Sequence, residues 1–176
     1  MAAPILALFF DSGDTLIDED TQVFDEDGVV LKAELIPGAG ELVRELKRRG
    51  YRLGLVADGR TVSFRNSLEP HGLYDIFDVR AISEEVGVDK PHPNMFRKAL
   101  EGLGILPADY GRVVMVGNHL ARDIKGANEM GLISVWLDWA PRRPKVAADP
   151  SEEPCYTIRM PLELLSLLER LEERAR

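Results

Sequence analysis

Polar residues with chemically useful side chains follow the short apolar runs of this sequence. Asp11, Asp58 and Asn118 each come directly after such a run, and His119 follows Asn118. Carboxylates and imidazoles can act as nucleophiles, transfer protons or bind cations. If the runs are strands of an open parallel sheet, ligands bind beyond their carboxyl ends, so these residues should meet in one crevice. This convergence is a stronger signal than any single acid.

The apolar runs are rich in β-branched residues and alternate with amphipathic helical stretches. The predicted strands are 5–10, 52–57, 79–82, 113–116 and 133–137, and the predicted helices are 39–49, 61–69, 93–103 and 120–130. This alternation is typical of a parallel sheet that helices cover on both faces. We therefore expect one α/β domain over residues 1–176, a three-layer, doubly wound, Rossmann-like sheet.

Two segments lie outside this alternation. Residues 17–35 contain the turn sequence Asp-Glu-Asp-Gly between apolar stretches, which predicts a β-hairpin that projects as a flap. Leucines at helical spacing predict an amphipathic helix over about 161–174, which packs on the core or, alternatively, forms a dimer seam.

The long loop 138–154 contains several prolines and four large side chains, Trp139, Arg142, Arg143 and Lys145. A solvated connection is the simpler interpretation of this composition. The alternative is that the loop leans over the crevice.

Composition argues against several classes of partner. Twenty-two Lys and Arg against 30 Asp and Glu give a net charge of −8, so nucleic acid and anionic membranes are not expected partners. The apolar N-terminus lacks a basic region and is too short to span a bilayer, so a cytoplasmic protein is the default expectation. The only cysteine, Cys155, has no internal disulfide partner.

Four segments resemble, in order, the motifs of the haloacid dehalogenase (HAD) superfamily of aspartate-nucleophile hydrolases. They are Phe9–Leu16, Leu53–Gly59, Val88–Pro93 and Val116–Ala127. Their order and spacing argue against chance. The resemblance implies a HAD-like fold, and the short gaps between the motifs leave no room for a large cap domain.

The resemblance implies a chemistry in which an aspartate attacks a phosphoryl group while Mg²⁺ and a lysine neutralise its charge. Asp11 would be the nucleophile, and Lys90 would pair with it and with the phosphoryl oxygens. The Mg²⁺ ligands would be Asp11, the Gly13 carbonyl, Asn118 and Asp123. The substrate, a phosphorylated small molecule or a bulky phosphorylated substrate, would be bound by Asp58, Gly59 and Arg60.

The sequence departs from the family pattern at three catalytic positions. Gly13 stands where an acid/base aspartate is usual, a loss worth roughly 10²- to 10⁴-fold in rate unless Asp18 or Glu19 substitutes. Ala57 replaces a hydroxyl that normally donates to a phosphoryl oxygen. Asn118 replaces an aspartate, which should weaken cation binding. The neighbouring Asp14 should point away from the site.

Two functions therefore remain open. The first is a specialised or weakened Mg²⁺-dependent phosphohydrolase that forms a phospho-aspartyl intermediate at Asp11, on acyl or aryl phosphates that need little leaving-group protonation. The second is a non-catalytic scaffold with a regulatory or binding role. Retention of Asp11, Lys90 and Asp123 favours the enzyme, and the missing helical cap argues against a carbon–halogen hydrolase. An open site would suit a bulky substrate or a homo-oligomer whose neighbouring subunit closes the crevice.

Overall fold

A six-stranded parallel sheet forms the centre of the protein, in a computed structural model that describes residues 4–173. The strand order is β5-β4-β1-β6-β7-β8. The strands are β1 (Ala7–Phe10), β4 (Arg52–Ala57), β5 (Val79–Ile82), β6 (Val113–Gly117), β7 (Ile133–Leu137) and β8 (Tyr156–Ile158). The chain builds outward from β1 first in one direction and then in the other, so the ends of β1, β4 and β6 lie at the point where ligands bind in such sheets.

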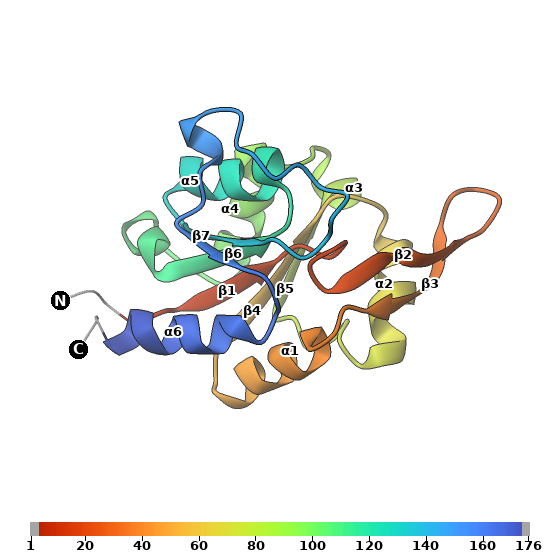
Figure 1. Ribbon diagram of the computed structural model, residues 1–176, viewed down its shortest axis with the longest axis horizontal. Coiled ribbons are helices and arrows are strands. Elements are labelled where there is room, and N and C mark those ends of the chain that lie inside the picture. The colour runs from red at the N-terminus through yellow and green to blue at the C-terminus, as the bar shows by residue number, and fades with distance from the viewer. Residues whose placement is uncertain (1–3, 174–176) are drawn as a thin grey trace.

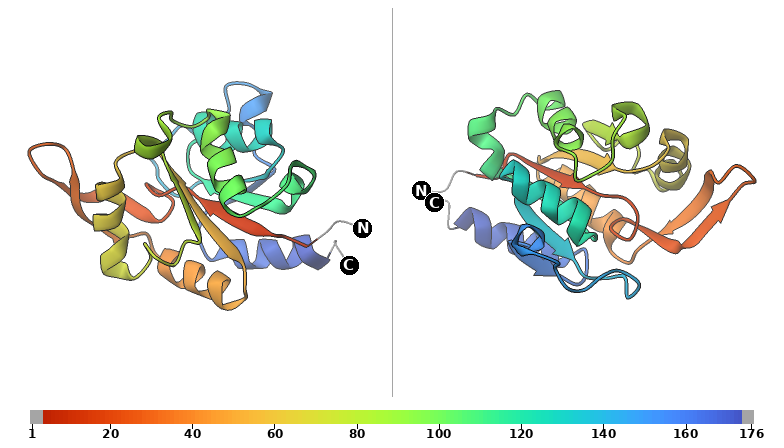
Figure 2. Two further views of the ribbon diagram at one scale, coloured as in Figure 1. Left: turned by 180° about the vertical axis from the view of Figure 1, so that it is seen from behind. Right: turned by 90° about the horizontal axis from the view of Figure 1, so that it is seen from above.

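Helices cover both faces of this sheet, as Figures 1 and 2 show. Helices α1 (Ala39–Arg48) and α6 (Glu163–Glu173) lie on one face, and α4 (Pro93–Gly102) and α5 (Lys125–Met130) lie on the other. Strand β1 is buried on both sides: Leu8 and Phe10 join one core, and Ala7 and Phe9 join the other. The three-layer, Rossmann-type fold that the sequence predicted is confirmed, and residues 4–173 contain no large cap.

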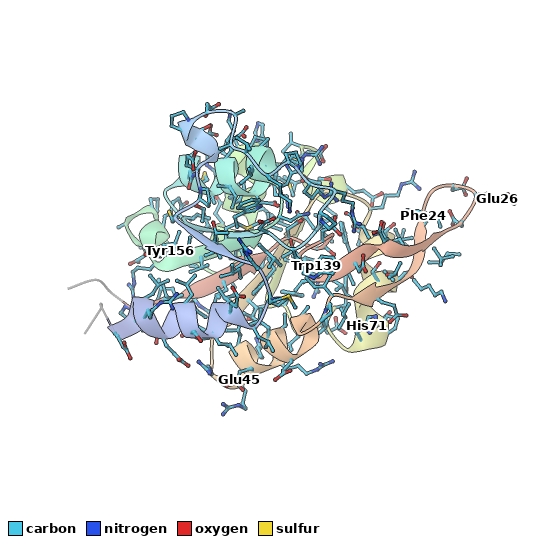
Figure 3. The ribbon with its side chains drawn as sticks, viewed as in Figure 1. Phe24, Glu26, Glu45, His71, Trp139 and Tyr156 are labelled. Atoms are coloured by element: carbon cyan, nitrogen blue, oxygen red, sulfur yellow. The ribbon has the colours of Figure 1, made fainter. Side chains whose placement is uncertain are left out.

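The predicted flap is an antiparallel hairpin of β2 (Ile17–Phe24) and β3 (Val30–Leu35). Its tip, with Phe24 and Glu26, projects far from the sheet (Figure 3). Helix α2 (Thr61–Leu68) packs against the hairpin, because the N–H of Val30, at the turn end of β3, donates to Ser63 Oγ at 3.1 Å. The flap therefore stands over one side of the crevice without enclosing it.

The remaining elements are short. They are α3 (Ser83–Val86), three 3₁₀ turns (Glu69–His71, Pro107–Arg112 and Pro150–Glu152) and a π-helical turn (Leu120–Ile124). The predicted helix 120–130 is thus a π turn followed by α5. The last predicted residue of the C-terminal helix, 174, lies outside the described residues. Within residues 4–173, no helix has the length and apolarity that crossing a membrane requires.

Candidate active site

Asp11 and Lys90 form an ion pair at the carboxyl end of the sheet. Asp11 directly follows β1, and Lys90 Nζ lies 2.8 Å from its Oδ1 atom and 2.7 Å from Asp123 Oδ1. The Lys90 ammonium also donates to the Val56 carbonyl at 2.7 Å. Only 1% of the Lys90 side chain is exposed, against 15% for Asp11. The lysine is therefore fixed, while Asp11 remains open to a ligand.

Asp58 and Asp123 hold the loops that carry this pair. The Lys90 backbone N–H donates to Asp58 Oδ1 at 2.9 Å, and Arg122 lies 3.5 Å from Asp58 Oδ2. The His119 N–H donates to Asp123 Oδ2 at 3.0 Å, across the π-helical turn. Asp58, predicted to bind substrate, therefore also positions the backbone of the lysine.

The carboxylates around Lys90 outnumber the cations, and the pKa values reflect this. Burial opposes the charged form of Lys90, but the carboxylates of Asp11, Asp123 and Asp58 outweigh it and raise the Lys90 pKa above its usual range. Burial and the charge of Asp123 raise the pKa of Asp11, although Lys90 opposes this. Burial likewise raises the pKa of Asp58. The site is short of positive charge and favours an added cation.

A cavity of about 440 Å³ opens above the pair. Its lining brings together all the predicted site residues: Asp11, Gly13, Asp58, Gly59, Arg60, Lys90, Asn118 and Asp123. Arg60 also donates to the Asp27 carbonyl on the flap at 3.0 Å. Arg122 and Arg143 add two further guanidinium groups to the lining.

The donor set at the end of the sheet fits a hard cation. Asp11, Asp123, the Asn118 amide and the Gly13 carbonyl offer oxygen atoms, which Mg²⁺ prefers. Asp11 Oδ2 makes a long contact of 3.4 Å with Thr15 Oγ1, and the buried Asn118 Nδ2 has no hydrogen-bond partner among residues 4–173. In the same range no three His, Cys, Asp or Glu side chains cluster as metal ligands. A cation would therefore depend on the amide and the carbonyl as well.

His119 lines the same cavity, and its Nδ1 atom is buried without a hydrogen-bond partner among the described residues. Burial and the nearby charge of Arg122 lower the His119 pKa. The imidazole is therefore neutral near pH 7 and is a weak candidate for a proton donor.

Asp14 is fully buried beside the site and points away from it, as predicted. Its backbone φ is +53°, in the left-handed region that glycine adopts most readily. Asp14 Oδ2 accepts from Arg142 Nε at 3.0 Å and from Arg143 Nε at 2.9 Å. These ion pairs offset the backbone strain.

The two arginines correct the simpler interpretation of loop 138–154 as a solvated connection. Arg142 also pairs with Asp18 and Asp20, and Arg143 pairs with Glu19 and lines the cavity. The loop therefore packs against the base of the flap and reaches the cavity through Arg143, which agrees with the alternative interpretation that it leans over the crevice. Arg143 is a site residue that the motifs did not identify, because it lies outside all four of them. The sequence singled it out only as a large side chain in the Pro-rich loop.

Comparisons with known proteins agree with this geometry. A sequence profile described as haloacid dehalogenase-like hydrolase matches residues 6–131. A glyceraldehyde 3-phosphate phosphatase of Pyrococcus furiosus is 33% identical over 77% of this chain and 55% of its own length. A phosphoserine phosphatase of Thermus thermophilus is 36% identical over 66% of this chain and 45% of its own length. The chain thus spans about half the length of the curated relatives it matches.

Solved structures support the fold. The HAD-hydrolase YfnB of Bacillus subtilis, solved bound to magnesium, has a TM-score of 0.76 at 20% identity over 94% of this chain and 99% of its own. A HAD phosphatase of Thermococcus onnurineus has a TM-score of 0.74 at 23% identity over 93% of this chain and 98% of its own. At this identity the likeness speaks for the architecture alone.

Proposed function

The chain belongs to the haloacid dehalogenase-like hydrolase family, and we propose that it is a phosphohydrolase whose nucleophile is Asp11. The observation that carries this proposal is the placement of Lys90 Nζ within 2.8 Å of Asp11 and 2.7 Å of Asp123 at the floor of the cavity. A solvated lysine would not be held this way. Buried there, it neutralises the charge of an entering phosphoryl group.

The proposed reaction uses the two oxygens of Asp11 differently. Oδ1 is held by Lys90, which leaves Oδ2 to attack phosphorus. A bond forms between Oδ2 and phosphorus while the bond to the leaving oxygen breaks, giving a phospho-aspartyl group and, after protonation, a free alcohol. Water then attacks phosphorus, which releases inorganic phosphate and restores the Asp11 carboxylate.

We propose Mg²⁺ as the cofactor, held by Asp11, the Gly13 carbonyl, Asn118 and Asp123. When bound, it would supply the positive charge that this carboxylate-rich site lacks. Lys90 is shared between the carboxylates of Asp11 and Asp123, while Arg122 pairs with Asp58. Asn118 lowers the negative charge of the ligand set, so we expect cation binding weaker than an aspartate there would give.

The proposed substrates are phosphorylated small molecules. A cavity of about 440 Å³ suits such a ligand. Asp58, Gly59 and Arg60 are proposed to contact it, with the Arg60 guanidinium compensating for the hydroxyl that Ala57 lacks. The names of the two relatives indicate alkyl phosphates as their substrates. Such substrates require leaving-group protonation, and Gly13 cannot supply it.

The test is phosphate release by wild type and Asp11→Asn with and without Mg²⁺. The panel includes glyceraldehyde 3-phosphate, phosphoserine, 4-nitrophenyl phosphate and acetyl phosphate. Asp75→Asn is the matched control, because this aspartate is exposed and is not among the residues that line the cavity. We expect Mg²⁺-dependent activity that Asp11→Asn abolishes and Asp75→Asn retains. Activity that survives Asp11→Asn would contradict the proposal.

A non-catalytic scaffold is the second candidate function. The observation that favours it is the combined change at Gly13, Ala57 and Asn118, which removes an acid, a hydroxyl donor and a metal carboxylate. A folded wild type that hydrolyses none of the panel would support this candidate. Binding of Mg²⁺ or of a phosphorylated ligand without turnover would then define its role.

A further inference from the structure

The space above Gly13 is filled by another carboxylate. A Cβ atom added to Gly13 would overlap the side chain of Glu19, lying 2.7 Å from its Cδ and 3.1 Å from its Cγ, with Oε1 nearer still. Glu19 comes from strand β2 at the base of the flap, six positions along the chain. The carboxylate of Glu19 therefore lies where a side chain at position 13 would project.

Glu19 is held in this place from two directions. Its Oε2 atom pairs with Arg143 Nη2, and its backbone N–H donates to Asp14 Oδ1 at 3.3 Å. Arg143 is fixed in turn, because its Nε donates to Asp14 Oδ2. With Oε2 anchored by Arg143, Oε1 is the oxygen that faces Gly13. Glu19, Gly13 and Asp11 all line the same cavity.

The other acid that could replace the missing group, Asp18, is engaged elsewhere. Asp18 Oδ1 accepts from the Asp20 N–H at 3.0 Å and lies 3.3 Å from Arg142. It is not among the residues that line the cavity. Of the two neighbouring acids, only Glu19 reaches the site.

We propose that Glu19 is the general acid and base of this protein, taking the place of the side chain that Gly13 lacks. This role rests on the proposed phosphohydrolase activity. As Asp11 attacks phosphorus and the bond to the leaving oxygen breaks, protonated Glu19 gives its proton to that oxygen, which leaves as an alcohol. The Glu19 carboxylate then takes a proton from the water that attacks the phospho-aspartyl group. This step releases inorganic phosphate and restores the Asp11 carboxylate and protonated Glu19.

The inference has a consequence for substrate range. With an acid in place, alkyl phosphates become accessible, so the protein is not limited to acyl and aryl phosphates as Gly13 alone implied. A purely structural Glu19, which served only as the partner of Arg143, would affect all substrates alike. The dependence of rate on the leaving group therefore separates the two roles.

The experiment compares wild type, Glu19→Gln and Asp18→Asn on an alkyl phosphate, phosphoserine, and on 4-nitrophenyl phosphate, whose leaving group needs little protonation. We expect Glu19→Gln to lower kcat on phosphoserine by about 10²- to 10⁴-fold and on 4-nitrophenyl phosphate by less than about tenfold. Asp18→Asn should change neither rate by more than about twofold, since it lies outside the cavity. Thermal unfolding of each variant checks that the proteins are folded.

A second variant tests the shared space directly. In Glu19→Ala the space above Gly13 is vacated, so Gly13→Asp in that background has room for the acid that the family motif usually carries. We expect the double variant to hydrolyse phosphoserine faster than Glu19→Ala alone. Equal rates in the two variants would contradict the assignment of Glu19 to this position.

The failures can be told apart. A wild type without activity, or with activity that Asp11→Asn retains, would overturn the proposed function and the role of Glu19 with it. An active, Asp11-dependent wild type in which Glu19→Gln lowers both substrates equally, or neither, would overturn the role of Glu19 alone.

Discussion

Two buried charges, Lys90 in the lining of the cavity and Asp14 outside that lining, have opposite surroundings. Lys90 is surrounded by carboxylates and lines the cavity, where Asp11 Oδ2 makes a long hydroxyl contact with Thr15. Asp14 is surrounded by arginines, and both of its oxygens accept hydrogen bonds from them. The cluster around Lys90 is short of positive charge, whereas the buried charge of Asp14 is fully matched.

The difference indicates which cluster is available for chemistry. A site that must bind a cation and a phosphoryl group needs unsatisfied carboxylate oxygens before its ligands arrive. In the Asp14 cluster the carboxylate is already paired with two arginines, so it has no free oxygen for a ligand. The cluster instead holds loop 138–154 against the segment that follows β1. We therefore assign reactivity to the Lys90 cluster and positioning to the Asp14 cluster, with Glu19 as the residue that joins them.

The largest expected effect comes from Lys90→Gln. Removal of the ammonium leaves the carboxylates of Asp11 and Asp123 buried without a cation, which should lower the free energy of unfolding by about 3–5 kcal/mol. Activity should fall by at least about 10²-fold, because phosphoryl charge is no longer neutralised. Urea unfolding and phosphate release measure the two effects, with the exposed Lys98→Gln as control. A stability loss below about 1 kcal/mol would show that Lys90 is not needed to balance these carboxylates.

The next effect is expected from Arg142→Gln with Arg143→Gln. Their side chains are 29% and 26% exposed, so solvent screens part of their attraction, but Asp14 is fully buried. The double variant should lose about 3 kcal/mol in urea unfolding, more than either single variant, since each single variant leaves Asp14 one partner. The exposed Arg97→Gln is the control.

The single arginine variants separate stability from activity. Arg143 anchors Glu19, whereas Arg142 contacts other acids. We expect the two single variants to lose similar stability, and only Arg143→Gln to hydrolyse phosphoserine more slowly. This result would show that the Asp14 cluster acts on catalysis through Glu19. Equal activity in the two single variants would break the link between the Asp14 cluster and catalysis.

The Lys90 cluster was accessible from the sequence because a simple rule places it. Asp11, Asp58 and Asn118 each follow a strand, and the ends of neighbouring parallel strands meet. The strands themselves are marked by short, largely apolar runs of four to six residues. Four of the five predicted sheet strands were therefore located within one residue at each end, and β1 begins two residues later than predicted.

The Asp14 cluster was not accessible in the same way. Arg143 and Glu19 are 124 residues apart, and no local periodicity indicates where a Pro-rich loop will lie. The direction of Glu19 was also hidden, because the pairing of β2 with β3 shifts register between Asp18 and Val23. Such an irregularity interrupts the alternation by which a strand's two faces are read. Strand β8 was missed because three residues are too few to show alternation.

Asn118→Asp tests the charge shortage of the Lys90 cluster without removing any group. An added carboxylate among Asp11 and Asp123 should lower stability in the absence of Mg²⁺ by about 1 kcal/mol, or about 2–4 °C in the unfolding temperature for a domain of this size. Mg²⁺ should then raise the unfolding temperature more in the variant than in wild type, because ligand charge strengthens binding. Asn94→Asp, on an exposed helix face, is the control. A smaller Mg²⁺ effect in the variant would contradict Asn118 as a ligand.

The smallest effect is expected at Asp78, which forms a partly exposed ion pair with Lys47. This pair is the reference against which the two buried clusters are compared. Burial opposes its charged form, but hydrogen bonds from Lys47 and the Leu53 N–H outweigh this and lower the Asp78 pKa. Since the folded pKa lies below the unfolded value of about 3.9, the stabilisation is complete above that pH and is lost as the pH falls through the folded pKa. Asp78→Asn should therefore cost about 0.5–1 kcal/mol at pH 7, after screening of a side chain that is 34% exposed.

Urea unfolding of wild type and Asp78→Asn between pH 7 and pH 2.5 measures this difference, with Asp75→Asn as the exposed control. The gap between the two proteins should be constant above about pH 5 and close toward acid, because only the charged form of Asp78 gains from Lys47. A gap that widens as the pH falls would mean that the carboxyl is stabilised in its protonated form. In that case burial would determine the pKa of a carboxyl even in a partly exposed ion pair of this protein. The Asp78 pair could then not serve as the reference for comparing the Lys90 cluster with the Asp14 cluster.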